Sequence, residues 1–262
     1  MPVDLDLVTC AVIVGAGAAA GFVNSIVGSG TLISFPTLVG IGYVDRIANI
    51  TNNTGLVPGS FSAAATQRKE LTGQRNRLMR LVPASVIGGT VGALLLFVLP
   101  SRYFARIVPF LVLLGVVLVL LGPVIQRRLK ARAGADRGVV DRAERISPLL
   151  QVGVALAGVY GGYFGAAQGV ILMGLMGASI DDSLPRINAV KNVLAGTVNL
   201  VAATIFVIHG GVVWAAAGLL AVGSTAGGLA GSRFGRRIPP NLLRRVIAAV
   251  GLVAAAHLFA NW

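Results

Sequence analysis

The chain has 262 residues, of which 55% are hydrophobic, 12% are charged and 35 are glycine. Soluble domains carry about 25% charged residues, so this composition excludes a soluble globular protein and predicts an all-α polytopic membrane protein. The net charge of +13 does not indicate a nucleic-acid partner, because the basic residues are confined to short loops between apolar segments, as membrane topology requires.

The first element is an uncharged run over residues 7–44, in which Asp, Glu, Lys, Arg and His are all absent. As one helix it would exceed about 50 Å, beyond a hydrocarbon core of about 30 Å, yet it is too short for two crossings of about 20 residues each. Its middle, residues 21–31, is polar and rich in glycine. These features predict a helix that enters the membrane, breaks and turns back.

A second uncharged run covers residues 146–180 and has a similar polar, glycine-rich middle at residues 160–169. It makes the same prediction of a break. The remaining apolar segments are expected to span the membrane, and they are residues 47–67, 81–101, 107–126, 187–208, 211–232 and 246–262.

An internal repeat relates the two halves of the chain. An offset of 139 residues, without gaps, aligns Gly30 with Gly169, Asn49 with Asn188, Asn53 with Asn192, Gly88, Gly89 and Gly92 with Gly227, Gly228 and Gly231, Pro100 with Pro239, and Arg106 with Arg245. Such an ordered set predicts two homologous halves. We expect one transmembrane transport domain over residues 1–262, with repeat 1 at about 1–126, a charged cytoplasmic linker at 127–145 and repeat 2 at about 146–262.

Two topologies are compatible with these segments. If each long run crosses once, there are eight spans, the halves are parallel, and the basic residues divide 12 against 10 between the two sides. If each run is re-entrant, six full spans remain, the halves are inverted, and the basic residues divide 19 against 3. The positive-inside rule favours inverted halves, with about eight membrane segments in all when the broken helices are counted.

The two break points are candidate binding sites for an anion. The half-helices that begin near Gly30 and Gly169 would present free N–H groups and a positive dipole end inside the membrane. The offset also aligns Ser29 with Gln168. The alternative is that the glycines serve only close helix packing.

The helix after each run carries a polar face. Spacings of four and seven place Asn49, Asn53 and Ser60 on one face, and Asn188, Asn192 and Asn199 repeat it. These side chains would bind a substrate or hydrogen-bond neighbouring helices. Lys191, at the position that corresponds to Asn52, would balance the charge of an anion or extend to the membrane surface.

The predicted substrate site comprises Gly28, Ser29, Gly30, Thr31, Asn52, Asn53, Gln168, Gly169, Lys191 and Asn192. No catalytic residue set is visible. The single cysteine and the isolated His209 and His257 argue against a metal site, and no cofactor is expected.

Several stretches carry a resemblance to a known family. They are residues 21–30 (GFVNSIVGSG), 35–42 (FPTLVGIG), 48–54 (ANITNNT), 158–165 (GVYGGYFG) and 188–192 (NAVKN). With them the chain resembles the sulfite exporter TauE/SafE family, whose known members move sulfite, sulfonates and related small organic anions. Family members usually carry more glycine after the first break, where this chain has Ser29 and Thr31.

The expected function is therefore secondary transport of a small anion, organosulfur or carboxylate, across the bacterial cytoplasmic (inner) membrane by a multi-pass protein. An anion channel on the same scaffold is the alternative, and a membrane enzyme or assembly partner is a third reading without a visible catalytic set. The expected partners are the anion, the lipid bilayer and a coupled H⁺ or Na⁺. Both a monomer and a homodimer fit.

Overall fold

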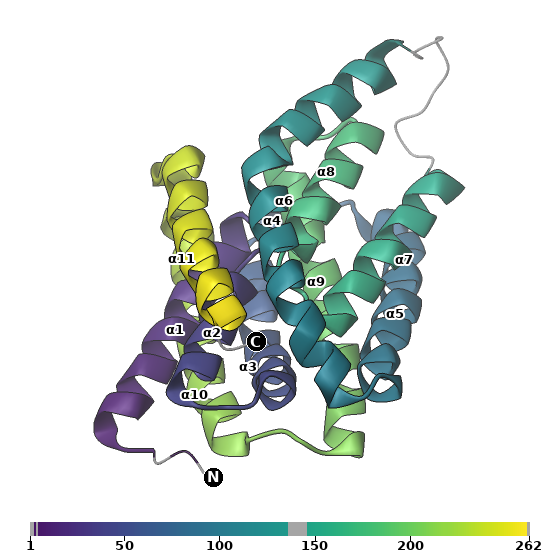
Figure 1. Cartoon of the computed structure of the whole chain (residues 1–262). Coiled ribbons are helices and arrows are strands. Elements are labelled where there is room, and N and C mark those ends of the chain that lie inside the picture. Colours follow the sequence, from purple (N-terminus) through teal and green to yellow (C-terminus); the bar gives the residue numbers. More distant parts are fainter. Residues whose placement is uncertain (1–2, 4, 136–145, 261–262) are drawn as a thin grey trace.

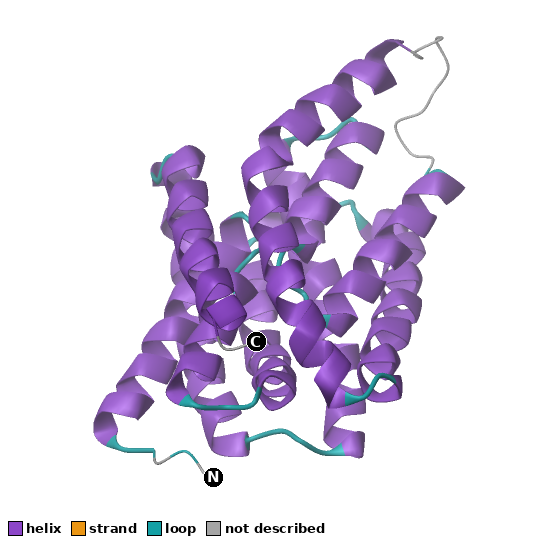
Figure 2. Cartoon of the chain, in the orientation of Figure 1, coloured by secondary structure: helices purple, strands orange, loops and turns teal. Residues whose placement is uncertain are grey.

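The structure is a computed structural model that describes residue 3, residues 5–135 and residues 146–260. Within these residues the regular structure is helical and no strand is present (Figure 2). The first half contains α1 (Leu7–Ile26), α2 (Thr31–Ile41), α3 (Asp45–Thr66), α4 (Arg68–Leu71), α5 (Arg75–Val98) and α6 (Ser101–Ala135). The second half contains α7 (Pro148–Tyr163), α8 (Gln168–Ser179), α9 (Leu184–His209), α10 (Trp214–Phe234), the 3₁₀ turn η1 (Gly235–Arg237) and α11 (Pro240–Ala260).

Six of the described helices are long and apolar enough to cross a membrane, namely α1, α5, α6, α9, α10 and α11. Their composition and length confirm an all-α polytopic membrane protein. The long helix α3 is less apolar than these six because its first half carries several asparagine and threonine side chains. Helix α6 continues to Ala135, so the first nine residues of the expected linker extend the helix.

Both long uncharged runs are broken helices, as their length predicted. The first run divides into α1 and α2 around Gly28, and the second divides into α7 and α8 around Gly165. These two glycines have φ angles of +85° and +81°. A residue with a Cβ rarely adopts such angles, so glycine allows the chain to leave the helix at these points.

Each broken helix folds back on itself. In the first run Gly30, just before α2, packs against the backbone of Ala20 in α1. In the second run Gly153 of α7 packs against Leu175 of α8, and Gly161 packs against Gln168. Contacting residues on the two arms lie further apart in sequence as their distance from the turn increases, which is the pattern of an antiparallel hairpin. We call the turns of the two hairpins, with the first residues of α8, the hairpin tips; they are residues 27–30 and 164–169.

Corresponding helices of the two halves run in opposite directions. Near the end of α3, Gln67 accepts a hydrogen bond from Asn188 near the start of α9. Further along, Ser60 of α3 packs against Gly196 of α9. The two helices are therefore antiparallel, as inverted halves require.

The glycines that repeat at the 139-residue offset pack corresponding helix pairs. In α5, Gly88 lies against Ala155 of α7, and in α10 the corresponding Gly227 lies against Ala18 of α1. A Cβ on Gly227 would lie 1.9 Å from the Ala18 carbonyl oxygen. Small residues thus let backbones approach closely, which is a usual means of helix association in lipid.

The helices define two ends of the molecule. The end of α6 and the connection between α10 and α11 lie at the top of Figure 1, whereas the N-terminus and the connection between α9 and α10 lie at the bottom. The top end carries the arginine-rich connections at residues 68–80 and 233–245. We call it the basic end.

Candidate substrate site

The two hairpin tips meet. The backbone N–H of Gly169, in the first turn of α8, donates a hydrogen bond of 3.1 Å to the carbonyl oxygen of Gly28. A Cβ on Gly28 would lie 2.3 Å from the Cα of Gly169. Neither position therefore tolerates a side chain without a shift of backbone.

Asn24 connects the two sides of the first break. Its side-chain oxygen accepts a hydrogen bond of 2.9 Å from the backbone N–H of Gly30, at the start of α2. Its carbonyl oxygen accepts a hydrogen bond of 2.7 Å from the Lys191 ammonium. The Asn24 side chain thus satisfies a backbone N–H at the amide end of α2, and Lys191 satisfies the Asn24 carbonyl at the carbonyl end of α1.

The polar face of α9 caps the carbonyl end of α1. The side-chain amide of Asn188 donates to the carbonyl of Ser25 at 2.9 Å, and that of Asn192 donates to the same carbonyl at 3.4 Å. Together with Lys191, these side chains satisfy carbonyls that the break leaves without helical partners.

Helix α3 provides the corresponding cap to the other half. The side-chain amide of Asn49 donates a hydrogen bond of 2.9 Å to the carbonyl of Tyr163, the last residue of α7. Since Asn49 and Asn188 correspond at the offset of 139, the capping is reciprocal: each half supplies an asparagine to the broken helix of the other. Hydrogen bonding to neighbouring helices, the alternative to substrate binding, is therefore part of the role of these asparagines.

Lys191 is wholly buried, with no exposed surface. The alternative in which it extends to the membrane surface is wrong, because Lys191 bonds to the carbonyl of Asn24 in the interior.

The predicted residues on α2 and α3 also contact one another. The Asn52 amide donates to the Thr31 hydroxyl at 3.3 Å, and the Ser34 hydroxyl donates to the Asn52 side-chain oxygen. The Asn53 amide donates to the carbonyl and side-chain oxygens of Asn49, both at 3.3 Å. The resulting polar cluster is buried between α2 and α3.

Two predicted residues have no partner for a buried polar atom. The Ser29 hydroxyl and the Gln168 side-chain nitrogen make no hydrogen bond in the part of the chain that the structure describes. The two residues are 0% and 3% exposed. Because buried polar groups are almost always paired, these atoms, one at each hairpin tip, are candidates for contacts with a ligand.

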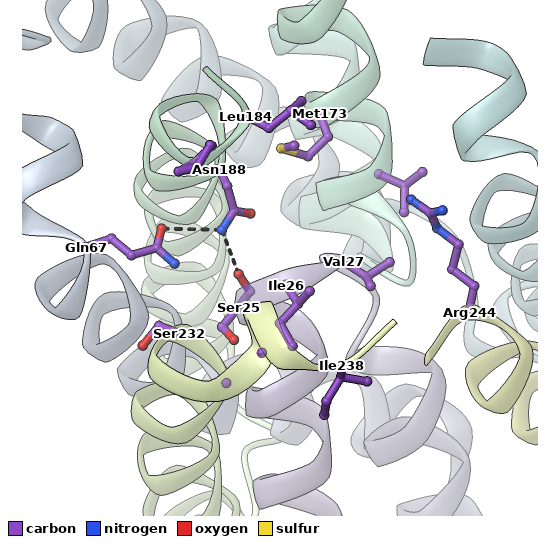
Figure 3. A pocket seen from close by; sticks show the side chains of 14 residues that line it. Ser25, Ile26, Val27, Gln67, Met173, Leu184, Asn188, Ser232, Ile238 and Arg244 are labelled. Carbon is purple, nitrogen blue, oxygen red and sulfur yellow. Dashed lines mark hydrogen bonds between the residues drawn. The ribbon is translucent and has the colours of Figure 1, made fainter. Parts of the chain in front are cut away.

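A cavity of about 280 Å³ lies between the first hairpin tip and the basic end. Its walls come from both halves, and Figure 3 shows Gln67 and Arg244 on opposite sides of it. The described residues that line it are Ser25, Ile26, Val27, Gln67, Val170, Met173, Leu184, Pro185, Asn188, Gly231, Ser232, Gly235, Ile238 and Arg244. The set combines an apolar surface with a few polar groups, which is typical of small-molecule sites.

None of the ten predicted site residues lines this cavity, although several are close in sequence to residues that do. Ser25 and Val27 in its wall directly precede the first break, and Val170 directly follows Gly169. Sequence reasoning missed Gln67 and Arg244 as cavity residues. Arg244 had been counted among the topological charges of its loop, and a single glutamine at the end of a span carries no spacing signal.

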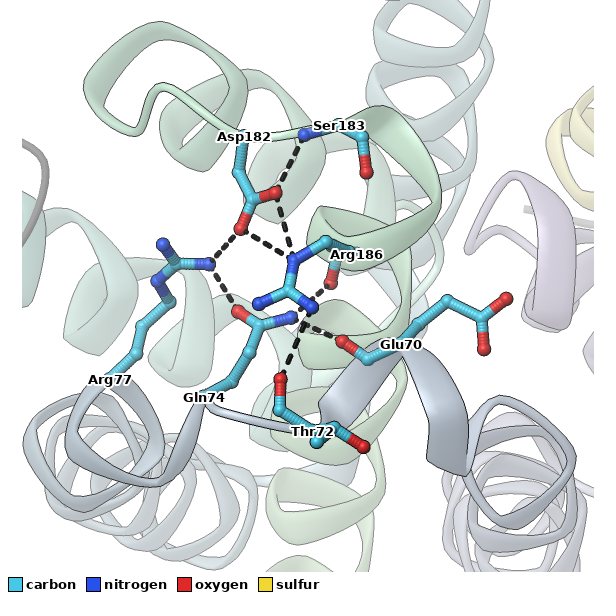
Figure 4. A network of polar contacts seen from close by, with 7 residues as sticks. All are labelled: Glu70, Thr72, Gln74, Arg77, Asp182, Ser183 and Arg186. Atoms are coloured by element: carbon cyan, nitrogen blue, oxygen red, sulfur yellow. Dashed lines mark hydrogen bonds and ion pairs between the residues drawn. The ribbon is translucent and has the colours of Figure 1, made fainter.

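A polar network joins the two halves at the basic end (Figure 4). Asp182, between α8 and α9, forms ion pairs with Arg77 at 2.8 Å and with Arg186 at 2.9 Å. Arg186 also donates to the carbonyl of Thr72 at 3.1 Å, and Gln74 contacts both Arg77 and the Arg186 carbonyl. Burial by itself raises the pKa of Asp182, but hydrogen bonds from Arg77, the Ser183 N–H and Arg186 lower it below its ordinary value.

Comparison with known proteins agrees with this architecture. The family model described as Sulfite exporter TauE/SafE matches residues 13–258. The chain is 28% identical over 243 residues to the probable membrane transporter protein YfcA of Escherichia coli, which covers 91% of this chain and 85% of the relative. It is 26% identical over 262 residues to a probable membrane transporter protein of Haemophilus influenzae, covering 98% and 96%. No solved structure matches.

Broken hairpins that meet inside a polytopic helical fold are typical of membrane transporters, and the relatives are named probable membrane transporter proteins. The chain belongs to the sulfite exporter TauE/SafE family. Its homologues and its six candidate spans place it in a bacterial cell membrane as a multi-pass protein.

Proposed function

We propose that this protein is a secondary transporter that moves a small anion, such as sulfite or a short sulfonate, across the cytoplasmic membrane. The observation that carries the proposal is the pair of buried, unpartnered polar atoms at the hairpin tips, on Ser29 and Gln168, beside a cavity that Arg244 lines. These groups can donate hydrogen bonds to an oxyanion, and the guanidinium supplies positive charge.

The size and chemistry of the cavity support this substrate class. At about 280 Å³ it is slightly smaller than sites for drug-sized ligands, so it suits a compact ion. Arg244 lines the cavity on the side away from Gln67 and Asn188, which also belong to its wall (Figure 3). The family name, sulfite exporter, supports a sulfur oxyanion.

The proposed transport cycle follows from the position of the cavity. The positive-inside rule assigns the basic end to the cytoplasm, so the cavity would admit an anion from that side. Passage to the other side would require the hairpin tips to separate from each other, with the anion held at Ser29, Thr31 and Gln168 and at the amide ends of α2 and α8. Movement of one half against the other would alternate access to the site.

Uptake into proteoliposomes tests the proposal. We expect saturable uptake of radiolabelled sulfite or sulfoacetate, and acceleration when the vesicles are preloaded with the same anion. Arg244→Gln should raise the half-saturating concentration about tenfold, which corresponds to about 1.4 kcal/mol. Arg245→Gln is the matched control, because Arg245 is the exposed neighbour.

The outcomes distinguish the candidate functions. Counter-transport supports a carrier, whereas an ohmic current through single molecules would indicate the anion channel. Absence of flux with sulfite, thiosulfate, sulfoacetate, taurine and simple carboxylates would refute the proposed function.

A further inference from the structure

The Lys191 amine is buried and has no counter-charge in the part of the chain that the structure describes. Its ammonium nitrogen has one hydrogen-bond partner in the described chain, the carbonyl of Asn24 at 2.7 Å. The side chain has no exposed surface. The ion pairs that the described residues show near α9 belong to Asp182 at the basic end and do not include Lys191.

The helices packed against α9 bring no carboxylate to Lys191. These helices are α1, α3, α4, α5, α7 and α8. Their titratable residues, with those of α9 itself, are Cys10, Asp45, Arg46, Arg68, Lys69, Glu70, Arg75, Arg77, Arg80, Tyr160, Tyr163, Arg186 and His209. The two acidic ones lie at a helix end, Asp45 at the start of α3 and Glu70 in α4 at the basic end.

An ammonium group in this position has two ways to avoid the cost of an uncompensated buried charge. It can lose its proton, because a neutral amine still donates a hydrogen bond to the Asn24 carbonyl. It can also keep the proton if an anion lies close to it. Binding of a proton and binding of an anion therefore favour each other, and this coupling is reciprocal.

The amine is close to the proposed path of the anion. Lys191 lies one turn along α9 from Asn188, which lines the cavity, so the two share a side of the helix. Its partner Asn24 directly precedes Ser25 in the cavity wall and bonds to Gly30 at the amide end of α2. A neutral Asn occupies the corresponding position in the first half, at residue 52, so only the second half carries the amine.

We propose that Lys191 couples anion transport to protons. The amine is neutral in the empty carrier, takes up one proton as the anion binds, and releases that proton when the anion leaves. Each cycle thus moves one proton together with one anion, and a monovalent anion crosses without net charge. This inference rests on the proposed function and assigns its coupling ion as H⁺ and not Na⁺.

Proton uptake on binding is the direct test. Purified protein in a weakly buffered detergent solution near pH 7 is mixed with thiosulfate or sulfoacetate, neither of which titrates there, and a pH-indicator dye reports the protons taken up. Calorimetry in the same solution counts the anions bound. We expect a proton uptake that approaches one per anion in the wild type and falls at least fivefold in Lys191→Met and Lys191→Arg. Lys69→Gln, which changes an exposed lysine at the basic end, should retain the wild-type value.

Transport provides a second readout that a purely structural role would not affect. A pH gradient, acidic outside, should accelerate wild-type uptake into proteoliposomes. Lys191→Arg should lose this acceleration, and any anion exchange that remains should no longer respond to the pH gradient, because a guanidinium does not release its proton.

Each result decides one of the two proposals. Anion binding without proton uptake by the wild type would overturn the coupling and leave the proposed function intact, even if the variants do not fold. An unchanged response of Lys191→Arg to the pH gradient would also overturn it. A wild type that neither binds nor moves these anions would refute the proposed function, and this inference with it.

Discussion

The backbone N–H of Gly169 donates a hydrogen bond to the carbonyl oxygen of Gly28, and this bond joins the two hairpin tips across 141 positions of the chain. The bond uses the backbone N–H of Gly169 at the start of α8. The sequence predicts that this group binds the anion. An anion at this position would replace the Gly28 carbonyl. Contact between the tips and occupation of the site by substrate are therefore alternatives.

Substitution of Gly169 by alanine should destabilise the protein and abolish transport. A Cβ there would lie 2.4 Å from the Cα of Gly28, where only backbone can give way. We expect a loss of about 1–3 kcal/mol, the usual cost of overpacking. Thermal unfolding in detergent measures the first effect and proteoliposome uptake the second. The control is Gly15→Ala in α1, where a Cβ would meet no atom within 4 Å; equal behaviour of the two variants would contradict the contact.

Removal of the unpartnered polar atoms should affect transport and spare stability. Ser29→Ala and Gln168→Met delete groups that form no hydrogen bond in the described structure, so the free energy of unfolding should change by less than about 0.5 kcal/mol. Uptake should fall about tenfold or more, since each lost hydrogen bond to a charged ligand is worth about 1.5–3 kcal/mol. Wild-type uptake by both variants would exclude these residues from the site.

Removal of a capping amide should reduce the stability of the protein. Asn49→Ala and Asn188→Ala leave the carbonyls of Tyr163 and Ser25 without these donors, at a cost of about 1–3 kcal/mol each. Unfolding temperatures in detergent check this, with Asn241→Ala on the exposed start of α11 as control. Asn192→Ala should cost less, because its hydrogen bonds are 3.4 Å long. Stability equal to the control would show that the caps contribute nothing.

The ion pairs of Asp182 should stabilise the protein at neutral pH and not in acid. The folded protein holds the pKa of Asp182 below its ordinary value, whereas the unfolded chain has a value of about 3.9. The contribution is therefore complete above about pH 4 and is lost as the pH falls through the lowered value. Asp182→Asn should cost about 1–2 kcal/mol at pH 7, and the difference from wild type should shrink in acid. Asp181→Asn, at the exposed neighbouring residue, should show neither effect.

The broken hairpins could be predicted because their cause is local. The length of an uncharged run, compared with the thickness of a bilayer, predicted that residues 7–44 and 146–180 are neither one span nor two. The glycine-rich stretches predicted the breaks within a few residues of Gly28 and Gly165, where the structure has them. The repeat predicted two homologous halves, and Gly88 and Gly227, which correspond at the offset, both pack against the backbone of a neighbouring helix.

The roles of the polar side chains could not be predicted in the same way. Spacing placed Asn49 and Asn188 on a helix face, but their partners are carbonyls of the opposite half, more than 100 positions away in the chain. Periodicity carries no information on such a pairing. Arg244 shows the same limit, because a charge near a helix end has the same sequence pattern whether it faces solvent or lines a cavity.

The exchange of caps between the halves has a consequence for biosynthesis. When the ribosome has completed α6, the carbonyls of Asn24 and Ser25 are made, but α9, which supplies their donors, does not yet exist. The bilayer interior offers no water to replace those donors. These hydrogen bonds can therefore form only after α9 has been synthesised, so the contacts that complete the first broken helix come late in translation.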